Sequence, residues 1–156
     1  MQSKTWDAEA ASHVIAAFAG TAGGLLPMLH ALQDTFGYIP EPAEPMIAEA
    51  LNISRAEVHG VVTFYHDFRR PPAGRHELKL CQAEACQATG CGALAARAEE
   101  KLGVAMGETS ADGRVTLEPV YCLGLCSVSP AAMLDGRIVA RLDDRKLDAL
   151  LAEASR

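Results

Sequence analysis

Two short stretches decide the fold of this chain: LKLCQAEACQATG at residues 78–90 and PVYCLGLCSVSP at residues 119–130. The first contains Cys81 and Cys86 in a C-x4-C spacing, and the second contains Cys122 and Cys126 in a C-x3-C spacing, 35 residues later. Each pair begins where a predicted strand ends, so two loops at one sheet edge can bring four sulfurs together. Four thiolates are the ligands that one [2Fe–2S] centre requires, and the small residues around them let backbone N–H groups approach the sulfurs. The pattern therefore predicts an electron carrier with one cluster.

The N-terminal part, to about residue 70, has the pattern of four helices with short breaks. Apolar residues recur at helical spacing from Trp6 to a glycine-rich break, and again from Leu25 to the break at Gly37. A third, short helix is predicted over residues 45–51. Ser54 and Glu57 fit a capping box at the start of the fourth helix. The buried face of that helix is predicted to contain Val58, Val61, Val62 and Tyr65.

The clearest break, FRRPPAG at residues 68–74, predicts a boundary between a helical domain, 1–72, and a second domain, 73–156. The second domain reads as strand, helix, strand, strand, helix, with a two-residue turn at Asp135-Gly136 and a helix cap at Asp143. Strands are expected at residues 77–80, 115–121, 133–134 and 138–139. Helices are expected at residues 93–102 and after residue 143. This order predicts an α+β fold in which a helical bundle precedes a small mixed sheet flanked by helices.

Composition narrows the possible partners and compartments. The chain has 156 residues, 49% of them hydrophobic and 22% charged, with a net charge of −6, so nucleic acid is not expected as a partner. Its apolar runs are too short to span a bilayer, and MQSKTWDAEA at the N-terminus lacks the features of a secretory signal. Five cysteines, an odd number, argue against a disulfide framework, and together these features predict a cytoplasmic protein that does not insert into a membrane.

Cysteines in such pairs can also form other kinds of metal or redox site. Structural zinc also takes four cysteines, but the sequence lacks C-x2-C, the spacing of most zinc knuckles, so spacing favours iron–sulfur over zinc. The same absence argues against a thioredoxin-type dithiol. Neither cysteine loop contains the two histidines of a Rieske centre, and Cys91 comes too late for a plant-type ferredoxin motif. Cys91 opens an alanine-rich helix and is predicted to be a packed residue or a free thiol. A zinc-stabilised scaffold and a thiol sensor using Cys91 remain as alternative functions.

Taken together, the motifs resemble the thioredoxin-like [2Fe–2S] ferredoxin family. The resemblance extends from Leu25 to the end of the chain, and its other quoted segments are LLPMLHALQDTFGYIP at 25–40, ISRAEVHGVVTFYHDF at 53–68 and CLGLCSVSPAAML at 122–134. Members include the small NADH-module subunit of respiratory complex I and related subunits of bidirectional hydrogenases and soluble formate dehydrogenases. The loop CQAEACQATGC at 81–91 most resembles the gamma subunit of NAD-dependent, molybdenum-containing formate dehydrogenases.

The resemblance implies a ligand set, a fold and a set of partners. It implies that Cys81, Cys86, Cys122 and Cys126 hold one [2Fe–2S] cluster in a thioredoxin-like domain, with Pro130 where such domains often carry a cis-proline. It also implies a partner subunit that carries FMN and binds NAD(H), and a larger subunit with molybdenum and iron–sulfur centres. A flavin can exchange a hydride with NAD(H) and single electrons with a cluster, so it converts between the two kinds of chemistry. No flavin site, nucleotide site or acid–base pair is recognised in this sequence, so no independent catalytic site is expected in it.

Overall fold

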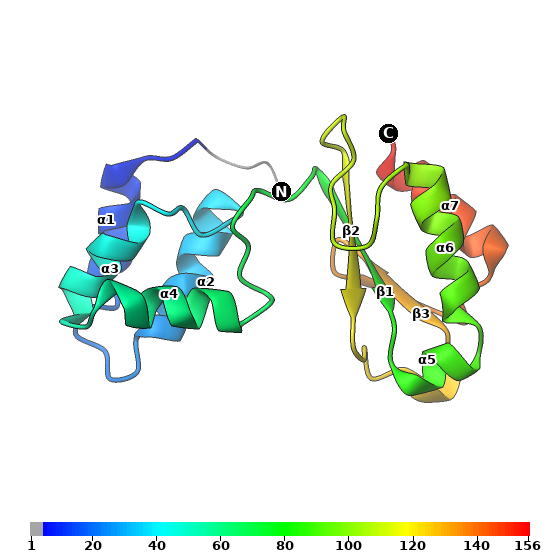
Figure 1. Cartoon of the computed structure of the whole chain (residues 1–156), viewed down its shortest axis with the longest axis horizontal. Helices are drawn as coiled ribbons and strands as arrows, with labels where there is room; N and C mark the ends of the chain where they lie inside the picture. Colours follow the sequence, from blue (N-terminus) through cyan, green and yellow to red (C-terminus); the bar gives the residue numbers. More distant parts are fainter. Residues whose placement is uncertain (1–4) are drawn as a thin grey trace. The chain divides into compact units, whose positions relative to one another are not determined.

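The computed structural model describes residues 5–156. Residues 1–4 therefore lie outside the described residues. They belong to the N-terminal segment in which no secretory signal is expected. The chain divides into two compact units, Met1–Pro72 and Ala73–Arg156, shown in Figure 1. Each unit has a hydrophobic core of its own.

The first unit is a helical bundle of α1 (Ala8–Ala16), α2 (Leu25–Phe36), α3 (Ala43–Leu51) and α4 (Arg55–Phe64). Its helices begin and end at residues suited to those positions. The Asp7 carboxylate accepts hydrogen bonds from free amides at the start of α1, and Gly37 ends α2 with a φ of 83°. Ser54 and Glu57 form the predicted capping box. The largest fully buried side chains of the unit are Phe36, Met28, Leu29, Leu32, Ile39, Ile47 and Val58, with the Glu44 carboxylate among them.

The predicted buried face of α4 is only partly correct. Val58 and Val62 are buried and Val61 is half-buried, but Tyr65 is 43% exposed. The reason is that α4 ends at Phe64 and the backbone of Tyr65 is extended, with a φ of −88° and a ψ of 108°. The helical periodicity therefore no longer applies at Tyr65, and its ring packs edge-on against Phe64, which is 72% exposed.

The second unit contains a four-stranded mixed sheet with the strand order β2-β1-β3-β4. Its strands are β1 (His76–Cys81), β2 (Val115–Val120), β3 (Ala131–Leu134) and β4 (Arg137–Ala140). β1 and β2 run parallel, whereas β3 is antiparallel to both β1 and β4. The predicted turn at Asp135-Gly136 joins β3 to β4, with φ values of 50° and 85° that suit these two residues.

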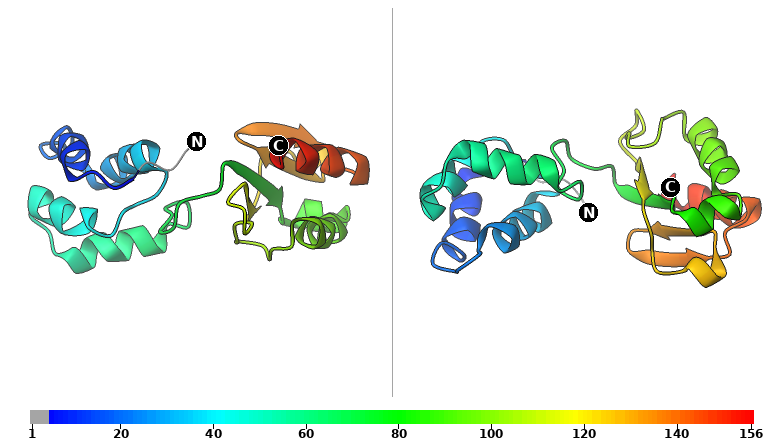
Figure 2. Two further views of the ribbon diagram at one scale, coloured as in Figure 1. Left: turned by 90° about the horizontal axis from the view of Figure 1, so that it is seen from above. Right: turned by 60° about the horizontal axis from the view of Figure 1, so that its bottom comes forward.

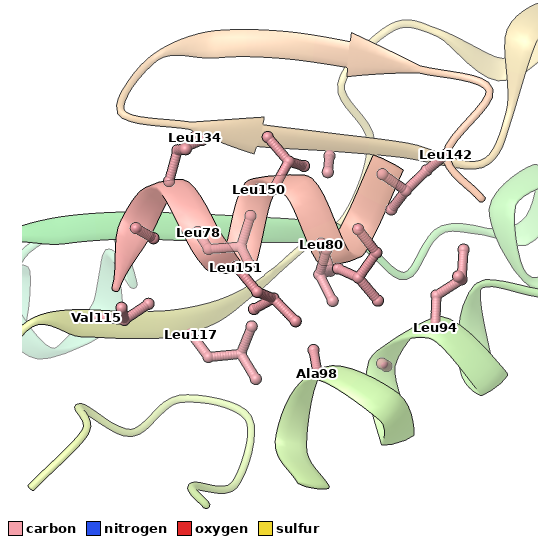
Figure 3. Close-up of a cluster of buried hydrophobic side chains, with 14 residues drawn as sticks. Leu78, Leu80, Leu94, Ala98, Val115, Leu117, Leu134, Leu142, Leu150 and Leu151 are labelled. Carbon is pink, nitrogen blue, oxygen red and sulfur yellow. The ribbon is translucent and has the colours of Figure 1, made fainter. Parts of the chain in front are cut away.

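Two helices, α6 (Cys91–Leu102) and α7 (Asp144–Ala154), contact each other and pack on the sheet. Figure 3 shows that leucines from β1, β2 and α7 meet Ala98 of α6 in this core. Alternation along β1 explains the arrangement, because Leu78 and Leu80 point into the core while Lys79 faces away and pairs with Glu77. Replacing a buried leucine such as Leu80 with alanine is expected to cost about 2–5 kcal/mol of stability.

The structure confirms the predicted α+β fold and adds elements that the sequence did not indicate. The additions are a short helix α5 (Glu84–Ala88) between β1 and α6, and a 3-10 turn η1 (Cys126–Val128) after β2. The Ser129–Pro130 peptide bond is cis, at the position where domains of the resembled family often carry a cis-proline.

Candidate metal centre

The two cysteine loops lie at the same end of the sheet because β1 and β2 run parallel (Figures 1 and 2). Cys81 is the last residue of β1 and is in register with Val120, the last residue of β2. Cys122 follows two residues later. Since parallel strands end at the same sheet edge, the topology alone brings both pairs to one place.

Cys81 and Cys86, here called the inner pair, are enclosed by the protein and are each 2% exposed. Cys86 lies in α5, where sequence reasoning expected a loop. The short helix begins three residues after Cys81 and returns the chain toward the end of β1, so that the two thiols hydrogen-bond each other. The inner pair packs with Cys91 and Ala131 in a small buried cluster of its own.

Cys122 and Cys126, here called the outer pair, are exposed and lie on an irregular loop. Their Sγ atoms are 3.7 Å apart, and the Gly124 amide donates to the Cys122 Sγ over 3.3 Å. Cys122 has a φ of 108°, a value that non-glycine residues rarely adopt. Gly124 follows with a φ of 75°, so the tight path of this loop depends on both residues. Strained backbone of this kind concentrates at functional sites.

Backbone amides converge on the Cys81 sulfur. Burial opposes ionisation of this thiol, but hydrogen bonds from the Ala83 amide and the Cys86 thiol, and from the amides of Cys122 and Leu123, outweigh it. The pKa of Cys81 therefore lies below its ordinary value. Amides from both loops thus surround one sulfur, an environment that stabilises a thiolate.

The partner thiol in each pair is harder to ionise. Burial and the hydrogen bond to Cys81 raise the pKa of Cys86 to about 11, although the Ala131 amide acts in the opposite direction. The hydrogen bond to Cys122, and then the charge of Cys122, raise the pKa of Cys126. A second thiolate beside the first is unfavourable unless a cation lies between them. Each pair is therefore suited to ligate a metal ion.

The arrangement fits a two-iron cluster better than a single ion. Two thiolates on one tetrahedral metal, with metal–sulfur bonds of about 2.3 Å, are about 3.8 Å apart, close to the separation in the outer pair. Within residues 5–156, no three histidine, cysteine or acidic side chains gather closely enough for one ion. A [2Fe–2S] centre needs two ligands on each of its two irons, so it needs two neighbouring pairs and not a group of four. The donor set fits that centre and favours it over structural zinc.

The structure places the fifth cysteine outside these pairs. Cys91 is the first residue of α6 and is buried, as its sequence context predicted, and its Sγ lies 3.5 Å from the Oε1 of Gln82. Sequence reasoning missed which amides face the sulfurs, among them those of Ala83, Leu123 and Ala131. The only available signal was the small size of the residues around the cysteines, because the amide directions depend on α5 and on the path of the outer loop.

Known proteins resemble the chain over most of its length. The family model of thioredoxin-like [2Fe-2S] ferredoxins matches residues 11–155. A subunit of the NADH-quinone oxidoreductase of Pseudomonas aeruginosa is 41% identical over 107 residues, which cover 69% of this chain and 64% of that protein. The corresponding NADH-quinone oxidoreductase protein from Escherichia coli K12 is 34% identical over 143 residues, which cover 92% of this chain and 86% of that protein.

A solved structure shares the fold. The NAD+-reducing [NiFe]-hydrogenase in its H2-reduced state matches with a TM-score of 0.74 and 29% identity, over 86% of this chain and 22% of the hydrogenase chain. The family match spans nearly all of the described residues, and the cysteine pairs lie within it. The chain therefore belongs to the thioredoxin-like [2Fe-2S] ferredoxin family.

Proposed function

We propose that Cys81, Cys86, Cys122 and Cys126 are the four ligands of one [2Fe–2S] cluster, and that the chain is an electron-transfer subunit of an NAD-linked oxidoreductase. The observation that carries the proposal is the meeting of an inner and an outer cysteine pair at the ends of two parallel strands. When bound, such a cluster accepts and releases one electron at a time.

The chain's own residues would give that cluster one protected side and one accessible side. The inner pair excludes water because both of its cysteines are buried among apolar side chains. Amides directed at Cys81 stabilise negative charge on its sulfur. The outer pair lies at the protein surface, so a redox partner can approach closest on that side. The 73–156 unit is accordingly proposed as the ferredoxin domain.

The proposed partner is a subunit that carries FMN and binds NAD(H). The names of the relatives support it, since the matched bacterial proteins are subunits of NADH-quinone oxidoreductases and the matched structure is an NAD+-reducing hydrogenase. A flavin converts hydride chemistry into one-electron steps, so it is the group that would exchange electrons with a cluster. The chain covers 64% of the Pseudomonas relative and 22% of the hydrogenase chain, and the remainder of the machinery would lie in other domains or subunits.

Within this family we propose that the chain is the gamma subunit of a cytoplasmic formate dehydrogenase whose larger subunit carries molybdenum and iron–sulfur centres. The first cysteine loop, residues 81–91, supports this choice. In residues 5–156 no helix is long and apolar enough to cross a membrane. The names of the relatives favour a second candidate, the corresponding subunit of an NADH-quinone oxidoreductase or of an NAD-linked hydrogenase.

The helical unit, 1–72, is proposed as the surface that docks on the flavin-bearing partner. It contains an apolar groove of about 1000 Å³ between the glycine-rich loop at residues 19–24 and α4. Phe64 and Tyr65 line this groove and are 72% and 43% exposed. Exposed aromatic side chains beside a groove are typical of interaction surfaces.

Anaerobic purification of the tagged full-length chain from its own cells tests both the complex and the docking surface. We expect a complex that contains FMN and reduces NAD+ with formate. Hydrogen- or quinone-dependent turnover without formate activity would replace the formate assignment by the second candidate, and recovery of a lone zinc protein would refute the proposal. Phe64→Asp should release the flavin-bearing subunit and leave the iron content unchanged. Thr63→Asp, at an exposed neighbour, is the matched control for the docking surface.

A further inference from the structure

One buried amide beside the inner pair lacks a hydrogen-bond acceptor. The side-chain Nε2 of Gln82 is inaccessible to solvent and has no hydrogen-bond partner. The other end of the same amide is used, because the Cys91 thiol donates to its Oε1 over 3.5 Å. A buried N–H without an acceptor is unfavourable, so such a group indicates an acceptor that comes from outside the chain.

The surrounding contacts fix the Gln82 backbone next to the cysteines. Gln82 directly follows Cys81, and its amide donates to the Val120 carbonyl over 2.8 Å, which ties it to the strand that leads to the outer pair. Its carbonyl accepts from the Gln87 side chain over 2.8 Å. With the backbone held on both sides, the contact with Cys91 sets the direction of the side chain.

Cys91 is itself part of the buried cluster around the inner pair. It packs with Cys81 and Cys86, and it is held at the start of α6 by Gly90, whose φ is 93°. Its thiol donates to the Gln82 side chain over 3.5 Å. These contacts suit Cys91 to orient the amide, and they explain a fifth buried cysteine that the proposed ligand set does not use.

We propose that the Gln82 side chain donates its N–H to a sulfur of the bound cluster, with Cys91 holding the amide in that direction, and that this bond raises the reduction potential. The inference rests on the proposed function, because the acceptor belongs to the cluster. Hydrogen bonds to cluster sulfurs stabilise the more negative, reduced state, and they are among the main determinants of the potential. Gln82 and Cys91 are positioning residues in this account and not ligands.

The test is an EPR-monitored redox titration of the anaerobically reconstituted full chain. Gln82→Met keeps the length of the side chain and removes the donor. We expect this variant to retain two irons per chain and to shift the reduction equilibrium about tenfold toward the oxidised state, which for one electron is about 59 mV. Ala88→Met is the control, since it introduces the same side chain at an exposed position of α5 that forms no side-chain hydrogen bond. It should leave the potential near the wild-type value.

The Cys91 variants test the positioning role separately. Cys91→Ser keeps a donor for the Gln82 oxygen and should preserve the potential, whereas Cys91→Ala should lower it in the same direction as Gln82→Met by a smaller amount. An unchanged potential in Gln82→Met, or an equal shift in Ala88→Met, would overturn the inference. If Gln82→Met loses its iron, the two Cys91 variants decide the test. A lower potential in Cys91→Ala than in Cys91→Ser would support the inference, and equal potentials would overturn it. A wild-type chain that binds no iron would refute the proposed function itself.

Discussion

The inner and outer cysteine pairs differ in how the protein holds them. Cys81 ends a central strand and Cys86 lies in a helix, and both are buried. Cys122 and Cys126 are exposed on a loop whose path requires two positive φ values. The comparison indicates a division of labour, in which the inner pair retains the cluster and the outer pair presents it to a redox partner.

Replacement of a cysteine ligand is expected to have the largest effect, a loss of bound iron. Cys81→Ser should lose nearly all iron, because a buried serine is a poor ligand and no solvent can replace it. Cys126→Ser should keep a larger share, since solvent or the new hydroxyl can reach the exposed site. Iron per chain and visible absorbance after anaerobic reconstitution measure both variants, with Cys91→Ser as a control that keeps its iron. Equal losses from the two pairs would remove the proposed division of labour.

Thiol accessibility in the metal-free chain gives a second test of the difference. Alkylation with iodoacetamide, read by mass spectrometry, should modify Cys122 and Cys126 before Cys81, Cys86 and Cys91, because the first two are exposed and the other three are buried. Accessibility should dominate even though hydrogen bonds lower the pKa of Cys81. Modification of Cys81 or Cys86 as fast as that of Cys126 would show that the inner pair is not enclosed without its metal.

The strained backbone of the outer loop predicts a smaller effect. Gly124→Ala places a side chain at a φ of 75° where no neighbouring atom would clash, so backbone strain of about 1–2 kcal/mol is the expected loss of stability. Gly92→Ala is the matched control, since it is helical and also has open space, and alanine there should be neutral or stabilising. Calorimetry of the metal-free chain measures both variants, and similar effects at the two positions would argue against strain in the outer loop.

The smallest effect is expected at the far end of β1. Burial acts against ionisation of Asp135, but hydrogen bonds from the His76 ring over 2.7 Å and the Glu77 amide over 2.8 Å lower its pKa. A lowered folded-state pKa adds stability above the ordinary aspartate value of about 3.9, and that contribution is lost as the pH falls through the folded value.

Asp135→Asn keeps the turn, because asparagine also tolerates a positive φ. At pH 7 this variant should lose less than about 1 kcal/mol, since the pair is partly exposed. Calorimetry should show the difference from wild type shrinking as the pH falls below 4. The iron content should not change, and a loss of iron would show that the inner pair depends on the whole strand.

Most of the fold could be predicted from the sequence because its signals are local. The capping box at Ser54, the turn at Asp135-Gly136 and the cap at Asp143 each specify an element through neighbouring residues, and each is present in the structure. The meeting of the two cysteine loops at one sheet edge could also be inferred, because cysteine pairs that follow two strands point to one edge.

Other features depend on contacts that no local pattern encodes. The helix α5 has only five residues and lacks a side-chain cap, so it has no clear sequence signal. The exposure of Tyr65 depends on where α4 ends, and helix ends are less certain than helix interiors. The contact between Gln82 and Cys91 joins residues nine positions apart, and no local sequence pattern links them.

The most direct test of the central claim is a visible and EPR spectrum of the anaerobically purified chain, with iron and zinc analysis, before and after dithionite. The account predicts a red-brown protein with two irons per chain that takes up one electron and then gives a spin-one-half EPR signal. A colourless protein with one tightly bound zinc would contradict it.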